Sequence, residues 1–423
     1  MEQAGDPLVV VSSDTHIGPL LREQLSAYCP ERYQREFDEF AEHVATARVA
    51  MRRALAGSSR VARNQQTDGH HDVHARLRDL DYDGVAAEVI FHGSQNGEPM
   101  PFQSFGPFLG YENDDNLELL GVGYHIYNRW LADFCSVEPE RHVGLAHLPM
   151  WDIDAAVREA EWARAAGLRG VNFPAPKPHI ASYNSPEWEP FWSACEDLGL
   201  TFGNHGGAGN PSGSGAPGSN EVMVSELSAL SHVSPINQLV FGGVFERHPK
   251  LRLVLTELPG TWWSYTLNEL DSIYLLNSTA YGPELAERVP KLPSEYCREQ
   301  VFIGGSFLAR FEAEDAVAQG YETNVIWGSD YPHAEGTFQY PESWDDEPLT
   351  RVAMRYTFAG IDPDATALMV GQNAVRAYGL DGDALAKVAA RIDAPTTADL
   401  AVPVDDVPTD GGLLAFRQVG AWA

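Results

Sequence analysis

Carboxylate and imidazole side chains follow two short apolar runs that lie near opposite ends of this chain. Residues 8–13 lead into Asp14 and His16, and a second apolar run leads into Asp330 and His333. Asp14 and His16 are two residues apart, so on a strand their side chains project to the same side. An aspartate at the end of a buried strand must be paired or coordinated, because an isolated buried charge is costly. Imidazoles combined with carboxylates are the ligands of catalytic zinc, iron or manganese, so this spacing predicts a metal centre.

Other side chains that bind metals or transfer protons stand at the ends of further apolar runs. A lone histidine in a strand is usually a satisfied core residue, and we interpret His92 and His147 in this way. His205 precedes two glycines, which allow close approach of a backbone or a ligand. Glu257 has two interpretations, a buried salt bridge or a catalytic group. The histidine cluster at residues 70–74 is interpreted as structural, because it directly precedes a predicted helix.

Eight short apolar segments that alternate with amphipathic helical segments must position these groups. The predicted strands are residues 8–14, 86–92, 142–150, 170–174, 201–205, 251–257, 301–305 and 324–330. The predicted helices include residues 154–166, 187–198, 221–247 and 262–276, with apolar residues at three- and four-residue spacing. This alternation is the signature of an α/β fold of the parallel (β/α)₈, or TIM, barrel type, in which active sites form at the carboxyl ends of the strands.

The same pattern predicts how the chain is organised. We expect a barrel over residues 1–381 and an acidic, proline-containing extension over residues 382–423. Insertions at about residues 20–78, 93–123 and 206–219 interrupt the barrel. Each insertion follows a strand end on the catalytic face, where lids and substrate pockets are built.

Composition limits the classes of partner. The chain has 29 basic and 60 acidic residues, for a formal net charge of -31, which excludes nucleic acid and anionic membranes as expected partners. Its four widely spaced cysteines fit a reducing compartment, and no apolar stretch has membrane-spanning length. We therefore expect a cytoplasmic protein that acts on a small molecule. The absence of a G-x-S-x-G turn disfavours a serine nucleophile.

The motifs taken together resemble the amidohydrolase superfamily, in the branch that contains aminocarboxymuconate-semialdehyde decarboxylase and the hydroxybenzoate decarboxylases. The resemblance covers nearly the whole predicted barrel and depends on the order of its motifs. These are Ser13-Asp14-Thr15-His16, Arg76-Leu77-Arg78-Asp79-Leu80-Asp81, Tyr127-Asn128-Arg129-Trp130, Pro139-Glu140-Arg141, Gly242-Gly243-Val244-Phe245-Glu246-Arg247, Trp327-Gly328-Ser329-Asp330-Tyr331-Pro332-His333 and Gly371-Gln372-Asn373-Ala374-Val375-Arg376.

The resemblance implies a (β/α)₈ barrel that binds one divalent metal ion, for which we expect zinc with manganese and iron as alternatives, and that forms a homodimer or a higher homo-oligomer. It implies that Asp14, His16, His205 and Asp330 are the metal ligands. This sequence departs from the family pattern at two positions. Gly18 and Glu257 stand where relatives carry histidines.

These observations lead to a ranked set of functions. The first hypothesis is metal-dependent hydrolysis, or cyclisation by the same chemistry, of a small substrate with a carboxylate, amide or phenol group. The alternative is non-oxidative decarboxylation of an aromatic or muconate-like acid, and a barrel that binds without turnover ranks below both. The expected catalytic residues are Asp330, Glu257 and His333, and the expected substrate-binding residues are Trp262, Phe102 and Phe105.

Overall fold

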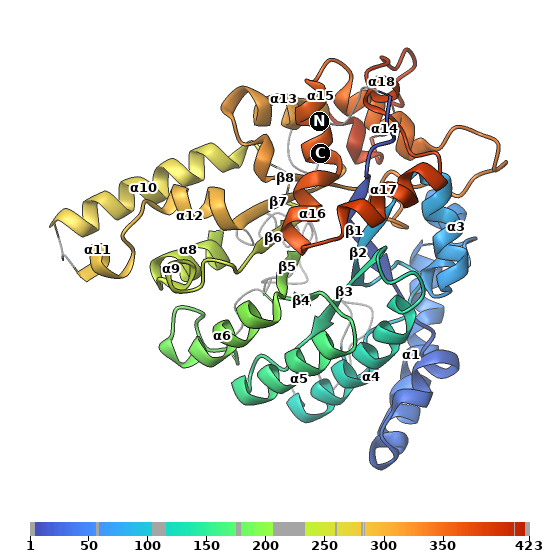
Figure 1. Cartoon of the computed structure of the whole chain (residues 1–423). Helices are drawn as coiled ribbons and strands as arrows, with labels where there is room; N and C mark the ends of the chain where they lie inside the picture. The colour runs from blue at the N-terminus through green and yellow to red at the C-terminus, as the bar shows by residue number, and fades with distance from the viewer. Residues whose placement is uncertain are drawn as a thin grey trace.

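The computed structural model describes residues 5–55, 59–103, 116–174, 179–205, 233–258, 260–280, 282, 284–409 and 411–418. Within these residues, eight strands pair in sequence order, all parallel, into one sheet that forms a barrel. The strands are β1 (Val11–Ile17), β2 (Ala87–His92), β3 (His142–His147), β4 (Gly170–Asn172), β5 (Thr201–His205), β6 (Leu253–Thr256), β7 (Val301–Ser306) and β8 (Val325–Gly328). The predicted (β/α)₈ barrel is confirmed, and Figure 1 shows the helices arranged around the strands.

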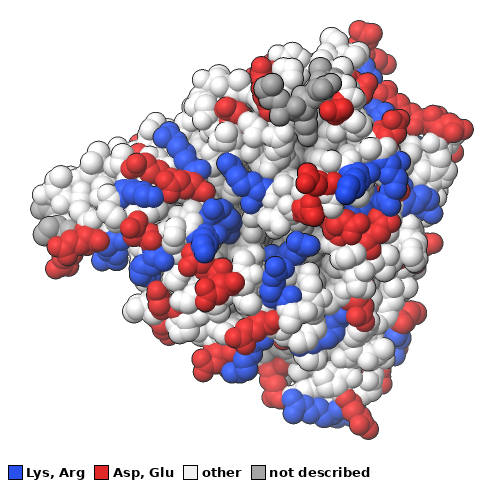
Figure 2. Space-filling view, in the orientation of Figure 1, with Lys and Arg blue, Asp and Glu red and all other residues white. Residues whose placement is uncertain are grey.

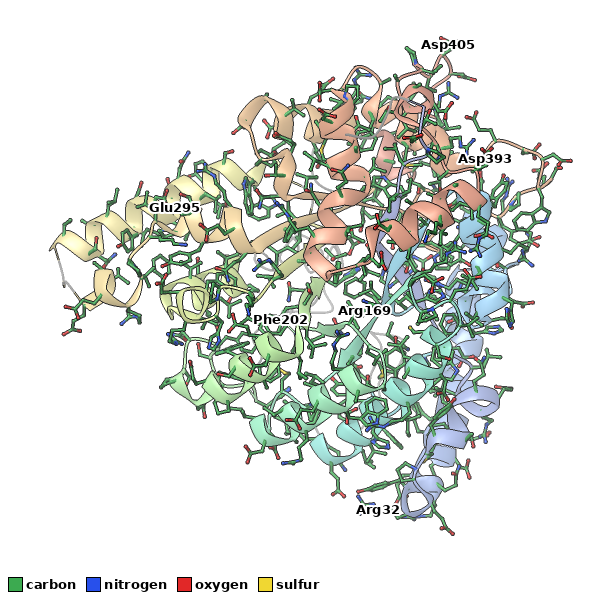
Figure 3. All side chains as sticks on the ribbon, viewed as in Figure 1. Arg32, Arg169, Phe202, Glu295, Asp393 and Asp405 are labelled. Carbon is green, nitrogen blue, oxygen red and sulfur yellow. The ribbon has the colours of Figure 1, made fainter. Side chains whose placement is uncertain are left out.

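The strands are buried on both faces, so most are rich in apolar residues, and the polar residues of β1 are buried and hydrogen-bonded. Alternate residues point into the barrel, where Val89 and Phe91 of β2 pack with Val143 and Leu145 of β3 in one cluster. Residues of the other parity, such as Ile90, pack in the larger cluster beneath the surrounding helices. Figure 3 shows the labelled Phe202 of β5 near the centre of the molecule and Glu295, Asp405 and Arg32 toward its edge.

The connecting helices begin and end where local sequence signals allow. The helices between the strands are α1 (Gln34–Leu55), α2 (Ser59–Asn64), α3 (Val73–Asp83), α4 (Leu117–Cys135), α5 (Ile153–Ala165), α6 (Glu189–Leu198), α8 (Val233–Phe241), α9 (Val244–Arg247), α10 (Trp262–Ala280), α11 (Glu284–Arg288), α12 (Pro293–Gln300) and α13 (Arg310–Gln319). Asp72 and Asp152 cap the amino termini of α3 and α5 by accepting backbone N–H groups. Gly84 and Gly199 end α3 and α6 in the left-handed conformation that glycine tolerates.

The helices that follow β8 are α14 (Leu349–Phe358), α15 (Pro363–Ala367), α16 (Asn373–Tyr378), α17 (Gly382–Arg391) and α18 (Thr397–Leu400). Of these, α16 and α17 close the amino-terminal end of the barrel. Ala377 and Tyr378 of α16 and Leu385 of α17 belong to the cluster that fills the barrel. Figure 1 views the molecule with these two helices in front of the strands. The mouth at the carboxyl ends of the strands is therefore the end available for chemistry.

The predicted insertions are described in part. The first contains α1 and α2, and the single turn Asp68–His70 lies close to α3. Residues 104–115 of the second insertion and residues 206–219 of the third lie outside the described residues. Acidic and basic side chains are interspersed over the face that Figure 2 displays. Among the described helices, not one is both long and apolar enough to cross a bilayer.

Candidate metal centre

Strand β1 brings Asp14 and His16 to the mouth of the barrel. Both residues are buried, with exposed fractions of 0% and 4%. Asp14 Oδ2 accepts a hydrogen bond from the hydroxyl of Ser306 at the end of β7. Asp14 Oδ1 lies 3.2 Å from His16 Nε2, and no described group donates a well-aligned hydrogen bond to it. A buried carboxylate oxygen in this state needs a cation nearby.

The turn after β8 aims Asp330 at the same point. Asp330 is fully buried and has a φ of +54°, a left-handed conformation that residues other than glycine adopt rarely. Its N–H donates to the Asp14 carbonyl oxygen at 2.9 Å. Its Oδ1 lies 3.2 Å from His16 Nε2 and 3.0 Å from His333 Nδ1, yet neither carboxylate oxygen receives a well-aligned hydrogen bond from a described residue. Strained backbone of this kind is typical of functional positions.

Strands β5 and β6 add His205 and Glu257 from the other side of the mouth. His205 Nε2 lies 3.2 Å from His16 Nε2 and 3.5 Å from Asp14 Oδ1. Its second nitrogen, Nδ1, lies 3.3 Å from Glu257 Oε2. Glu257 also has a positive φ, of +57°. A carboxylate in contact with the second nitrogen of a histidine fixes the orientation and tautomer of that ring.

The four side chains that the sequence predicts as ligands fit a divalent metal ion. Their ligand atoms fall into two overlapping groups, Asp14 with His16 and His205, and His16 with Asp330 and His333. The buried carboxylate oxygens that lack aligned donors lie against two imidazole nitrogens only 3.2 Å apart. Two nitrogen and two oxygen ligands suit manganese, iron or zinc. The chain thus offers a set of metal ligands. A bound cation would also pair with the buried carboxylate oxygens that lack a hydrogen-bond donor.

Hydroxyl and backbone groups join β1 to β8 directly beneath this donor set. The Ser12 and Ser329 hydroxyl oxygens lie 2.9 Å apart, and the Ser13 hydroxyl donates to the Trp327 carbonyl oxygen at 2.7 Å. The His16 N–H donates to the Tyr331 carbonyl oxygen at 2.6 Å. These bonds close the barrel and fix the two ligand-bearing strand ends relative to each other.

A buried ion pair supports β1 from the outer side of the barrel. Arg76 on α3 and Glu88 on β2 have no exposed surface, and Arg76 Nη2 donates to Glu88 Oε2 at 2.7 Å. Arg76 Nη1 also donates to the His16 carbonyl oxygen at 2.8 Å, and the Thr15 hydroxyl donates to Glu88 Oε2 at 2.8 Å. The Nδ1 atom of the buried His142 lies 2.9 Å from Glu88 Oε1. The sequence feature that could have predicted this network is a glutamate within the apolar run of β2.

The electrostatics of the centre follow from burial and from the pairing of opposite charges. Burial opposes ionisation of Asp14, but His205 and His16 outweigh it and hold the pKa of Asp14 well below its usual value. Burial likewise opposes protonation of His333, but the Asp330 carboxylate raises the pKa of His333 to about 10. Burial dominates at Glu257 and raises the pKa of that carboxyl well above its usual value, against the attraction of His205. The mouth therefore combines ionised and proton-holding groups.

The expected substrate-binding residues are not brought together. Phe102 is 1% exposed and packs in the core against the rings of Phe37 and Phe40. Phe102 is therefore a packing residue. The insertion that carries it folds back onto α1. Phe105 lies outside the described residues. Trp262 is half-buried at the start of α10, and its Nε1–H donates to the Leu258 carbonyl oxygen next to Glu257.

Sequence reasoning missed a polar pair on the rim of the mouth. His147 ends β3 and Asn172 ends β4, and the Asn172 amide nitrogen lies 3.1 Å from His147 Nε2. His147 shares its side of β3 with Leu145, which packs inside the barrel. The pair is half-buried. The sequence could have revealed this pair, because two adjacent strands both end in a hydrogen-bonding side chain on the inward-facing side.

Gly18, one departure from the family pattern, is tightly surrounded by neighbouring side chains. A Cβ atom at Gly18 would lie 2.3 Å from Asn96 Oδ1, closer than any real contact. The Asn96 amide donates to the Gly18 carbonyl oxygen at 2.7 Å. A histidine at position 18 would therefore require the Asn96 and Ser94 side chains to move.

Comparison with known proteins locates this architecture among characterised families. A family model described as amidohydrolase matches residues 114–380. A gamma-resorcylate decarboxylase of Rhizobium sp. (strain MTP-10005) is 26% identical over 136 residues, which are 30% of this chain and 42% of that protein. The chain thus matches less than half of the length of this relative.

Solved structures share the fold. The 5-carboxyvanillate decarboxylase of Sphingomonas paucimobilis aligns with a TM-score of 0.59 at 20% identity, over 88% of this chain and 100% of that one. A 5-carboxyvanillate decarboxylase of Novosphingobium aromaticivorans, solved with manganese and 3-methoxy-4-hydroxy-5-nitrobenzoic acid, aligns with a TM-score of 0.61 at 17% identity, over 89% and 98%.

These relatives correct the first functional hypothesis. Hydrolysis, with cyclisation by the same chemistry, was expected as the main reaction, and this prediction is wrong because the relatives that the chain matches are decarboxylases. The expectation of a divalent ion is supported, but zinc as its identity is not, because the ion bound in the related structures is manganese.

Proposed function

We propose that this chain, which belongs to the amidohydrolase family, is a metal-dependent non-oxidative decarboxylase of a small aromatic acid with a hydroxyl group next to its carboxylate. The observation that carries the proposal is the convergence of Asp14, His16, His205 and Asp330 at the barrel mouth. The names of its relatives, which act on resorcylate and carboxyvanillate, support the reaction and the substrate class.

In this proposal Asp14, His16, His205 and Asp330 hold one divalent ion, with manganese favoured by the related structures. When bound, such an ion acts as a Lewis acid toward the carboxylate and phenol oxygens of the substrate. The closed arrangement of β1 and β8 holds the ligands in place before the substrate arrives.

The reaction breaks the bond between the ring carbon and the carboxylate. Carbon dioxide leaves, the electron pair stays on the ring carbon, and that carbon takes one proton, so no oxidant or reductant is needed. We place Glu257 as the proton donor, because it directly follows β6 and contacts Nδ1 of His205, whose Nε2 lies near Asp14 and His16. Its contact with His205 Nδ1 also orients that ring.

Four further side chains are placed around the centre and the substrate. His333 Nδ1 lies 3.0 Å from Asp330 Oδ1 and holds that carboxylate directed at the centre. The Asn172–His147 pair supplies hydrogen-bonding groups at the rim for a ring hydroxyl. Trp262 offers an aromatic face near the end of β6.

Release of carbon dioxide tests the proposal directly. The purified chain is stripped of metal, reloaded with Mn²⁺, and incubated with 2,6-dihydroxybenzoate, 5-carboxyvanillate and benzoate as the control without a hydroxyl group. We expect Mn²⁺-dependent carbon dioxide from at least one hydroxylated acid, one deuterium on the ring when the reaction runs in D₂O, and none from benzoate. Stoichiometric Mn²⁺ binding without carbon dioxide from any ortho-hydroxylated aromatic acid would refute the proposed reaction.

A further inference from the structure

The segment Leu413–Arg417, which lies beyond the part of the chain that matches the family model, packs against the mouth of the barrel. Leu414, Ala415 and Phe416 form a small buried cluster with Phe307 at the end of β7 and with Ala353 on α14. This segment follows the last helix by more than ten residues, so its position depends on its own contacts.

Arg417 anchors the segment through a fixed fork of donors. Its Nη1 donates to the Phe307 carbonyl oxygen at 2.6 Å and to the Leu414 carbonyl oxygen at 2.9 Å. Its Nη2 donates to Glu312 Oε1 at 2.5 Å. Both side chains are buried, with exposed fractions of 2% and 3%. Only a planar guanidinium can meet this carboxylate and these carbonyl groups at once.

The Phe307 carbonyl belongs to a residue next to the metal centre. Phe307 has a φ of +49°, and a residue other than glycine holds this conformation only where surrounding contacts impose it. The preceding residue, Ser306, donates its hydroxyl to Asp14 Oδ2. Arg417 is therefore linked through Phe307 and Ser306 to a proposed metal ligand.

The segment also contacts the loop after β8. The Leu414 N–H donates to the Glu335 carbonyl oxygen at 3.3 Å. The carboxylate of Glu335 accepts the Gln95 amide at 2.9 Å and lies 3.8 Å from His333 Nδ1. His333 in turn contacts Asp330. One short segment thus contacts the residue next to Ser306 at the end of β7 and the loop after β8.

We infer that Leu413–Arg417 is a positioning element for the metal centre, with Arg417 as its positioning residue. Arg417 holds the Phe307 carbonyl, and thereby Ser306 against Asp14, while Leu414 holds the loop that carries His333. The inference rests on the proposed metal site and adds to it a dependence on the carboxyl-terminal extension.

Binding of Mn²⁺ to the full-length, metal-free protein tests this role, with electron paramagnetic resonance of free Mn²⁺ as the readout. The variants are Arg417→Lys, which keeps the charge beside Glu312 but loses the fork, and the double variant R417M/E312Q, which removes the buried pair as a whole. The matched control is Arg141→Met, because Arg141 is also buried and donates to the Val85 and Ala86 carbonyl oxygens, at the opposite end of the barrel.

We expect R417K and R417M/E312Q to weaken Mn²⁺ binding by roughly 10-fold, the range for substitutions behind a metal ligand. R141M should lower the melting temperature and leave Mn²⁺ affinity within about two-fold. If both Arg417 variants bind Mn²⁺ within two-fold of the wild type, the segment is only a packing element and the inference is wrong. Since the readout is binding, wild-type protein that binds Mn²⁺ but releases no carbon dioxide would refute the proposed reaction and leave this inference intact.

Discussion

The two halves of the candidate centre are built differently. Asp14, His16 and Asp330, on β1 and β8, are at most 4% exposed and lie in a continuous set of hydrogen bonds that includes the β1–β8 seam and the Arg76–Glu88 pair. His205 and Glu257, on β5 and β6, contact each other at 3.3 Å, and the His205 side chain is 18% exposed. The first half has more hydrogen bonds, and the second is slightly more exposed at His205, while the Glu257 side chain is itself only 9% exposed.

This difference teaches how one site can satisfy two opposed requirements. Metal ligands must be held within a fraction of an ångström, which favours burial and redundant bonding. A proton donor must instead reach a substrate atom, which favours partial access. Substitutions in the two halves should therefore separate into effects on binding and stability and effects on turnover.

Asp330→Asn should have the largest effect and tests whether the buried half holds the ion. The substitution keeps the shape of the side chain but removes the negative charge. Because a metal ion contributes several kcal/mol of charge stabilisation, we expect kcat/KM for carbon dioxide release to fall by at least about 1000-fold. Circular dichroism should stay unchanged. Activity within 10-fold of the wild type would show that Asp330 is not needed.

Arg76→Met tests whether the buried half owes its order to the ion pair. The change leaves Glu88 buried without its cation, and we expect the free energy of unfolding in urea to fall by about 3–5 kcal/mol. The double variant R76M/E88Q serves as the control and should recover part of this loss. A loss below about 1 kcal/mol would contradict the role given to the pair.

The pH dependence of stability tests a buried histidine, His70, outside the two halves of the centre. His70 is buried, its Nδ1 lies 3.0 Å from Ser94 Oγ, and burial lowers its pKa from 6.5 to about 4. The unfolded chain therefore takes up a proton near pH 6.5 that the folded chain refuses until pH 4, so stability falls as the pH drops through this window. The shift corresponds to about 3 kcal/mol.

His70→Gln, measured by urea unfolding of metal-free protein at pH 7.5 and pH 4, should lose about 3 kcal/mol less over this interval than the wild type. Equal losses in the two proteins would mean that His70 is not the group responsible.

Glu257→Gln probes the half formed by His205 and Glu257 and should have the smallest effect on the free energies. Removal of a general acid lowers the rate by about 100-fold at the low end of the usual range. We expect this loss in kcat, with Mn²⁺ affinity reduced less than 10-fold and stability unchanged. A variant that loses Mn²⁺ and keeps its kcat when reloaded would assign Glu257 to orientation of His205 alone.

The sequence sufficed for the barrel and for the strand-end groups, for physical reasons. Each strand is a short buried run followed by a polar residue, and parallel strands in a barrel deliver their carboxyl ends to one mouth. Asp14, His205 and Asp330 could thus be placed together without knowledge of any distance. The structure brings them together, while their role as ligands stays a prediction.

Contacts that depend on packing between elements could not be predicted. Arg76 and Glu88 lie 12 residues apart, but their pairing requires the exact seating of α3 on β2. Phe102 was expected near the substrate, yet it packs against α1 because the insertion folds inward. Arg417 contacts Phe307 and Glu312 only because the extension packs back against the mouth. No sequence pattern predicts where this extension packs.

The seam between β1 and β8 has a consequence for how the protein is made. Ser12 and Ser329 meet across 317 residues of chain. At roughly 5–20 residues per second, the ribosome releases β8 about 15–60 s after β1. During that interval Asp14 and His16 exist without Asp330, so the proposed set of four ligands is incomplete. If these residues bind the ion as proposed, all four can hold it only after β8 has been synthesised.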